Sequence, residues 1–461
     1  MLAGCTLEAE KPELALDTPA KYRAGAGEAA TPKLDWWRGF HSGELTSLIE
    51  QAQAHNFDIA VAVAQIEQAD AQVRIAQAPL FPSVNLDGSA SVGKSSSQTG
   101  GGGGGSVNHL YATNLSASYV LDFWGKQQST LVAAEESAIA SRYNREVVTL
   151  TAITTVATTY FQILAEEDSL RILHKDVEDS SRILDLIMQQ FSAGTASQIN
   201  VAQQQSLVSS LQAQIPPVEQ SRLQNMSALA VLVGKAPEHF MARGGSMMNI
   251  TMPHVTPGLP SQLLNQRPDL RQAEALLSAA NYDVNAARAA FFPSISLTAQ
   301  TGYQSAALRS LFGPTAWFYT TAASLTQPVF DAGLLAGQLD VQRALRQQAL
   351  QTYRKDVLSA FSDVEKALVA LEQTALQEKY LREDVLSSQM AFYLSEQQLR
   401  EGTVNLVTLL QTEQTLFQAE SQLVNAQQAH LLAAVSLFQA LGGGWSPTEK
   451  LADAAPAATK H

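Results

Sequence analysis

The stretch that decides the fold is Leu80-Phe81-Pro82-Ser83-Val84-Asn85-Leu86, because it returns later as Phe291-Phe292-Pro293-Ser294-Ile295-Ser296-Leu297. A second pair, Ala193-Gly194-Thr195 and Glu401-Gly402-Thr403, recurs after 208 residues, close to the 211 that separate the two prolines. A near-constant interval over so long a span indicates a duplicated unit. The joint falls at 234–260, where glycine, proline and methionine gather and the periodicity lapses.

The residue pattern changes period at each repeated proline. Before it, helical patterns cover Glu44–Ala78 and Asp269–Ala290. After it, apolar Val84 and Leu86 alternate with polar Ser83, Asn85 and Asp87, and a second alternating segment follows in each copy. We therefore predict one β-hairpin per copy, with about ten residues per strand, which is the length that crosses a bilayer when tilted.

Very long helical patterns follow the hairpins. Gly125–Phe191 and Gly333–Leu399 contain no proline, and at 1.5 Å per residue each predicts a helix of about 100 Å. After a Gly-Thr turn, shorter return helices are predicted over Ser197–Val233 and Asn405–Leu441, the first kinked at Pro216-Pro217. Leucine and alanine recur at heptad spacing in the last one, which indicates close antiparallel packing.

Composition excludes several classes of function. Charged residues make up 16% of the 461 residues, below the roughly 25% usual for soluble domains, and the net charge of −13 argues against a nucleic-acid partner. We find no stretch of about 18 apolar residues and expect no transmembrane helix. Gly88–Ser95 matches the phosphate-loop motif, but it continues a strand and cannot open a helix. We therefore expect no enzyme activity, no cofactor and no metal site.

The chain has one cysteine, Cys5. It follows Leu2-Ala3-Gly4, the small-residue pattern that precedes a lipid-modified bacterial cysteine, and nothing periodic surrounds it. We expect Cys5 to carry a lipid anchor.

Four strands cannot close a barrel, and open edges are not tolerated in lipid, so the chain must assemble with copies of itself. Two copies would give eight strands and a filled interior, whereas three would give twelve strands around a lumen. The polar strand face and the long helices favour the trimer. A non-conducting structural or adhesive trimer is the alternative from a different class.

Several motifs occur in order along nearly the whole chain: Gln266-Arg267-Pro268-Asp269-Leu270, Ala286-Ala287-Arg288-Ala289-Ala290 before the second repeat motif, Val329-Phe330-Asp331-Ala332-Gly333, and Ala440-Leu441-Gly442-Gly443-Gly444-Trp445. Through them the chain resembles the TolC-like outer-membrane factors, specifically the NodT-type efflux lipoproteins. The resemblance implies a mainly α fold with a small transmembrane β part, in which a homotrimer builds an α-barrel and a β-barrel.

The resemblance also implies a location, partners and a function. The channel would lie in the outer membrane of a Gram-negative bacterium, in contact with its lipid, and extend into the periplasm. It would dock with a periplasmic adaptor and an inner-membrane pump, and would carry small toxic compounds or drugs outward without using energy. An outlet for type I protein secretion or for metal efflux is the alternative within channels.

On this basis we divide the chain into five parts. They are a lipid-anchored tether (1–34), a first repeat (35–234), an equatorial linker (235–260), a second repeat (261–445) and a flexible C-terminal tail (446–461).

The turns at Gly194-Thr195 and Gly402-Thr403 resemble the hairpin tips that meet the adaptor, and the residues after them resemble the gate. Relatives carry Y-x-x-G-x-x-N-x-L-T-L-L-D-A-Q-R there, which places Gln411 at the position of the gate Asp and Gln414 at that of the Arg. We expect a neutral constriction of Val407 and Gln411, less cation-selective and less pH-sensitive than an Asp ring. The full set of predicted gate and tip residues is Asn200, Gln203, Val407, Gln411 and Gln414.

Overall fold

The structure is a computed structural model that describes residues 22, 33–94, 107–253, 258 and 260–445. Cys5 and its predicted lipid anchor lie outside these residues, as do most of the predicted tether and the C-terminal tail. The described chain is mainly helical with one four-stranded sheet, which confirms the predicted fold class.

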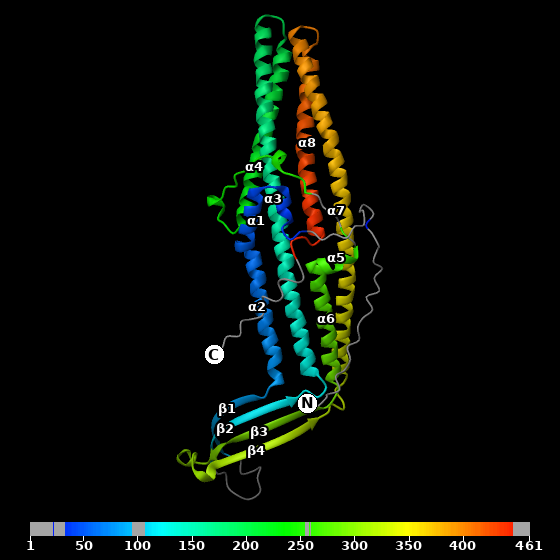
Figure 1. The fold of residues 1–461 in the computed structure, drawn as a ribbon. Coiled ribbons are helices and arrows are strands. Elements are labelled where there is room, and N and C mark those ends of the chain that lie inside the picture. Colours follow the sequence, from blue (N-terminus) through cyan, green and yellow to red (C-terminus); the bar gives the residue numbers. More distant parts are fainter. Residues whose placement is uncertain (1–21, 23–32, 95–106, 254–257, 259, 446–461) are drawn as a thin grey trace. The chain divides into compact units, whose positions relative to one another are not determined.

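The elements follow the same order twice (Figure 1). The first series is α1 (Gly43–His55), α2 (Phe57–Gln77), β1 (Ser83–Lys94), β2 (Val107–Leu121), α3 (Lys126–Ser192) and α4 (Gln198–Leu232). The second is α5 (Pro260–Gln266), α6 (Pro268–Ala289), β3 (Ser294–Ser305), β4 (Trp317–Thr326), α7 (Leu334–Arg400) and α8 (Leu406–Ala440). Short 3-10 helices lie at Trp36–Phe40, Ala78–Leu80, Pro237–His239, Met247–Asn249, Leu308–Ser310 and Pro314–Ala316.

The chain forms two compact units, and each contains segments from both series. Of the described residues, one unit includes 65–94, 107–142 and 272–354, and so contains the sheet. The other includes 33–64, 143–253, 260–271 and 355–445, and so contains α4, α8 and the turns that join them to α3 and α7.

The sheet is antiparallel, in the order β1-β2-β3-β4. Its register keeps like residues together: Ser83 lies opposite Ser118, and Val84 lies opposite Ala117. The hydroxyl oxygens of Ser83 and Ser118 are 2.8 Å apart, and those of Ser296 and Ser324 on β3 and β4 are 2.7 Å apart. One face of the sheet is therefore polar and the other apolar, as the alternation predicts.

The phosphate-loop match has no loop geometry. Residues Gly88–Lys94 belong to strand β1 and pair with β2, from Gly88 opposite Thr113 to Lys94 opposite Val107. The structure therefore supports rejecting a nucleotide site in the described part of this stretch.

The second unit has its core where the N-terminal 3-10 helix meets α1, α3, α4 and α8. Phe40, Leu45, Phe161 and Leu229 are fully buried there. Trp36 stacks on Phe438 of α8 with ring centroids 4.7 Å apart. Residues from both repeats thus share one core in this unit.

The sequence analysis predicts that no apolar stretch is long enough to span a membrane, and one helix does not fit this prediction. One 18-residue window of α3 has a mean hydropathy of 1.5, enough to span a membrane by length and composition, but 56% of it is buried inside the protein. Because Ile153, Val156 and Phe161 of α3 pack into the core just described, we assign the apolar part of this helix to the core.

The first predicted helix, Glu44–Ala78, is wrong in its continuity, because it breaks at Asn56 between α1 and α2. The Asn56 side chain accepts hydrogen bonds from the N–H groups of Asp58 and Ile59, and so caps α2. Its Nδ2 donates to the carbonyl of Leu232, near the end of α4, at 2.9 Å. The end of the return helix α4 is therefore hydrogen-bonded to the residue that separates α1 from α2.

The second repeat has the same arrangement at the break between α5 and α6. Arg267 Nη1 donates to the carbonyl of Ala440, near the end of α8, at 3.3 Å. The glycines that follow the return helices, Gly234 and Gly442, lie against the carbonyls of His55 and Gln266. Two further features differ from the sequence predictions. The short helix α5 is not among the predicted helices, and α4 continues as one helix through Pro216 and Pro217.

Candidate gate and docking tips

The turns at the ends of the two helical hairpins have the same backbone structure. The N–H of Thr195 donates to the carbonyl of Gln190, and that of Thr403 to the carbonyl of Gln398, both at 2.9 Å. Each threonine hydroxyl donates to the same carbonyl as its own N–H. This pattern closes the last turn of α3 and of α7.

Glycine is needed in both turns. Gly194 has φ of 76° and Gly402 has φ of 73°, in the left-handed region that favours glycine. A Cβ at either position would meet no atom within 4 Å, so the requirement comes from the backbone alone. The four residues predicted to meet the adaptor therefore form two equivalent, exposed turns.

Each return helix begins with a side-chain cap. In α4 the cap is Ser197, whose Oγ accepts from the N–H of Asn200 while its own N–H donates to Asn200 Oδ1 at 2.9 Å. In α8 the cap is Asn405, whose Oδ1 accepts from the N–H of Thr408 at 3.0 Å. Asn200, one of the predicted gate residues, is therefore held by this reciprocal cap.

The other predicted gate residues lie on the exposed faces of the return helices. Gln203 is exposed on α4, and Val407, Gln411 and Gln414 are exposed on α8. Behind them, Leu409 and Leu416 of α8 pack with Ile183 and Ile187 of α3 in a buried cluster. The cluster fixes the rotation of α8 about its axis, and so fixes which residues stay exposed.

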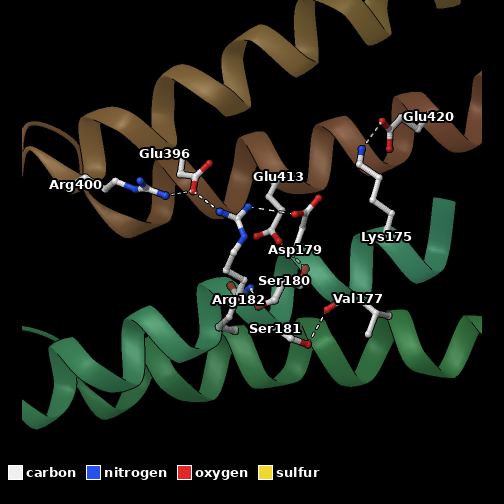
Figure 2. A network of polar contacts seen from close by, with 11 residues as sticks. Lys175, Val177, Asp179, Ser180, Ser181, Arg182, Glu396, Arg400, Glu413 and Glu420 are labelled. Carbon is white, nitrogen blue, oxygen red and sulfur yellow. Dashed lines mark hydrogen bonds and ion pairs between the residues drawn. The ribbon is translucent and has the colours of Figure 1, made fainter. Parts of the chain in front are cut away.

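An ion-pair network that the sequence analysis missed links α3 to α7 (Figure 2). Arg182 of α3 bonds to Asp179 at 3.1 Å and to Glu396 of α7 at 2.8 Å. Arg400 bonds to the same Glu396 at 2.7 Å. Because both arginine side chains are about half exposed, each pair contributes little alone, and the network chiefly orients the two helices.

Buried carboxyl groups lie next to this network, where α3 meets α4 and α8. Glu413 of α8 is fully buried and accepts a hydrogen bond from the Ser180 hydroxyl (Figure 2), while Gln204 of α4 donates to the Ser180 carbonyl at 2.9 Å. Asp176 and Glu420 are 2% and 7% exposed, and Lys175 lies 3.5 Å from Glu420. Three helices thus meet around groups that are costly to bury.

Burial changes the protonation of two of these carboxyl groups. Burial, together with the neighbouring Glu420, raises the pKa of Asp176 to about 8. Burial likewise raises the pKa of Glu413, against the opposing effect of its hydrogen bond from Ser180.

A sequence signal for these acids existed. Glu413, Glu420 and Gln427 recur every seven residues, four places after the heptad leucines Leu409, Leu416 and Leu423. Polar residues at a heptad position that the structure buries indicate a hydrogen-bonded seam.

Comparison with known proteins identifies relatives over most of the chain. The family described as "Outer membrane efflux protein" matches residues 48–235 and 259–443. The pyoverdine export outer membrane protein OpmQ of Pseudomonas putida is 36% identical over 447 residues, 95% of each chain. The probable efflux pump outer membrane protein TtgC of the same species is 31% identical over 458 residues, 96% of this chain and 94% of TtgC.

A solved structure agrees with the fold. The open state of the Neisseria gonorrhoeae MtrE outer membrane channel superimposes with a TM-score of 0.85 at 29% identity, and covers 96% of this chain and 98% of MtrE.

Proposed function

The chain belongs to the outer membrane efflux protein family, and on that premise we propose that its duct narrows at a neutral constriction of Val407 and Gln411 and carries small organic compounds. As a member it is an outer-membrane channel of the efflux type in a Gram-negative bacterium. Channels of this family form trimers and work with an adaptor and an inner-membrane pump. The duct that we propose performs no chemistry of its own.

The observation that carries the proposed gate is the exposure of uncharged side chains just beyond the tips. Val407 is 56% exposed, and Gln411, one turn further along α8, is exposed as well. Gln203 stands at the equivalent place on α4. A ring of amides and valines has no fixed charge to attract cations, and it does not titrate near neutral pH.

Single-channel recording of the reconstituted trimer tests the gate. Gln411→Asp should add one carboxylate per protomer, raise the preference for cations and make the conductance fall as the pH is lowered through the carboxyl pKa. Gln205→Asp, on an exposed position of α4, is the matched control and should change selectivity less. If Gln411→Ala and Gln411→Asp both leave conductance and selectivity unchanged, Gln411 is not at the constriction.

We propose that the turns at Gly194-Thr195 and Gly402-Thr403 contact the adaptor. Two equivalent exposed turns per chain would present six similar contacts in a trimer, and their hydrogen bonds make them rigid enough to be recognised. Site-specific photocrosslinking from position 195 or 403 in cells should capture the adaptor, whereas crosslinking from exposed Glu372 on α7 should not.

We propose small organic molecules as cargo because the matched relatives include a pyoverdine export protein and a probable efflux pump protein. A deletion strain should become sensitive to organic toxins or lose export of such a compound. Sensitivity to metal ions alone would favour the metal-efflux alternative, and an unchanged profile with impaired protein secretion would favour the type I outlet.

We keep the five-part division, with repeats at 35–234 and 261–445, as a proposal, together with the lipid anchor on Cys5. Metabolic labelling with palmitate should mark the protein, and Cys5→Ser should abolish the label.

A further inference from the structure

A groove lies between α3, α4 and α8, beginning one turn beyond Gln411. Its volume is about 490 Å³. Gln414, Gln418, Gln422 and Asn425 line it from α8, and all four are exposed. From α4 it receives only uncharged side chains, which are Leu207, Ser210, Leu211, Gln214 and Val218.

The groove lies on the same helix face as the proposed gate. Val407, Gln411, Gln414 and Gln418 follow one another at intervals of three or four residues, which places them along one side of α8. If Val407 and Gln411 face the duct, as the proposed function requires, the groove opens into the duct as well.

One charged side chain lines the groove, Asp176 of α3. It is 2% exposed, and its Oδ1 has no hydrogen-bond partner among the described residues. The charged groups that face Asp176 are Lys175 and Asp179 of α3 and Glu413 and Glu420 of α8. Acids outnumber the single lysine, and Lys175 already lies 3.5 Å from Glu420. In the described part of the chain, the Asp176 carboxyl group therefore has no cationic partner of its own.

We propose that this groove is a transit binding site for cationic, hydrogen-bonding cargo, in which a protonated amine of the passing molecule pairs with Asp176. The proposal rests on the proposed function, because it requires that cargo pass along this face of α8. Hydroxyl and amide groups of the cargo bond to Gln414, Gln418 and Gln422.

The chemistry of the lining side chains supports this ligand class. An unpartnered buried carboxyl oxygen is unfavourable. A cationic donor supplies the hydrogen bond that Asp176 Oδ1 lacks, and places a positive charge beside the carboxylate. Amide side chains donate and accept, so they bind polar groups in several orientations. A row of similar weak contacts lets a molecule bind and still move on.

The protonation of Asp176 gives the site a pH signature. Burial raises the pKa of Asp176 to about 8, so at pH 6 the empty groove holds a protonated acid. Because the cation binds the ionised form, a proton must leave first, and the affinity should rise by up to roughly tenfold per pH unit between pH 6 and 8 and then level off.

Calorimetric titration of the detergent-solubilised trimer tests the proposal, with kanamycin as the probe because it carries protonated amines and hydroxyl groups. Binding to the unmodified trimer should strengthen from pH 6 to 8. Asp176→Asn should weaken binding at pH 8 by tenfold or more and remove the pH dependence. Gln418→Leu, an exposed change that leaves the buried carboxyl groups in place, should weaken binding several-fold.

Two controls define the result. Gln205→Leu, exposed on α4 outside the groove, should bind kanamycin like the unmodified trimer. Maltotriose, which has hydroxyl groups and no amine, should bind weakly and equally to all variants. Kanamycin binding that neither Asp176→Asn nor Gln418→Leu changes would overturn the site. The conductance of the unmodified trimer without probe separately tests the channel function.

Discussion

At the scale of single residues, the two acids of α8, Glu413 and Glu420, are buried, while the exposed face of α8 near the tip is neutral. Glu413 lies inside, against Ser180, and Gln411 lies outside. The acids of α8 therefore affect the packing of the helices. An exposed acid at position 411 would act on ions in the duct instead.

Replacing Glu413 by Gln should stabilise the hairpins at alkaline pH. The pKa of Glu413 is raised in the folded state by burial, so the stability that its protonated form contributes is complete below the ordinary glutamate pKa and is lost as the pH rises through the raised value. Glu413→Gln should therefore unfold at a higher temperature than the unmodified protein at pH 8, and at a similar temperature at pH 4.

Thermal melts followed by circular dichroism at both pH values measure this effect. Glu401→Gln, exposed at the tip turn, is the matched control and should change neither melt by much. A lower melting temperature of Glu413→Gln at pH 8 would mean that the ionised carboxylate is stabilising, contrary to this account.

At the scale of elements, sequence periodicity predicts the limits of the long helices well. It does not predict the breaks in the shorter helices beside them. The predicted Gly125–Phe191 and Gly333–Leu399 differ by one residue at each end from α3 and α7. Their limits are local, set by glycine turns and side-chain caps. The break at Asn56 depends on Leu232, far away in sequence, and no local pattern contains that contact.

The glycines after the return helices should differ from the tip glycines in their tolerance to substitution. Gly402 and Gly442 both have positive φ, at 73° and 70°. A Cβ on Gly402 would meet nothing within 4 Å, but one on Gly442 would lie 2.6 Å from the carbonyl oxygen of Gln266. Gly402→Ala should cost about 1 kcal/mol from backbone strain alone, and Gly442→Ala about 3 kcal/mol, because the break between α5 and α6 must also move.

Chemical unfolding of the two variants gives the comparison, and Gly234→Ala should behave like Gly442→Ala because its Cβ would lie 2.4 Å from the His55 carbonyl oxygen. Equal losses for Gly402→Ala and Gly442→Ala would show that the helix break yields without cost, and would remove the close approach as the reason for glycine.

At the scale of the whole molecule, part of the candidate site could be predicted from the sequence and part could not. The two Gly-Thr turns are visible because they recur after a fixed interval and contain residues with local roles. The groove is not visible, because α3, α4 and α8 supply its lining from segments more than thirty residues apart. Asp176 in particular is an ordinary helical acid until α8 brings Glu420 next to it.

The two edge strands of the sheet require that the chain assemble with further copies of itself. In the described chain β1 and β4 each pair with one neighbour only, so each has an unpaired edge. Unpaired backbone groups are not tolerated in lipid, and further copies of the chain must therefore complete the hydrogen bonding. The alternation of faces then assigns the apolar side to lipid and the polar side to the lumen.

Two neighbouring residues on β1 test that assignment. Leu86 is 77% exposed on the apolar face, and Asn85 is exposed on the polar face, so arginine meets solvent at either position in the isolated chain. In a closed barrel Leu86→Arg would place a charge in lipid at a cost of about 2 to 4 kcal/mol per copy near the bilayer midplane, whereas Asn85→Arg would place it in the lumen. Leu86→Arg should therefore reduce the yield of heat-stable trimer in outer-membrane fractions, while Asn85→Arg should assemble and shift the channel toward anions. Equal assembly of the two variants would show that the faces are assigned wrongly, since only the surroundings of the face distinguish them.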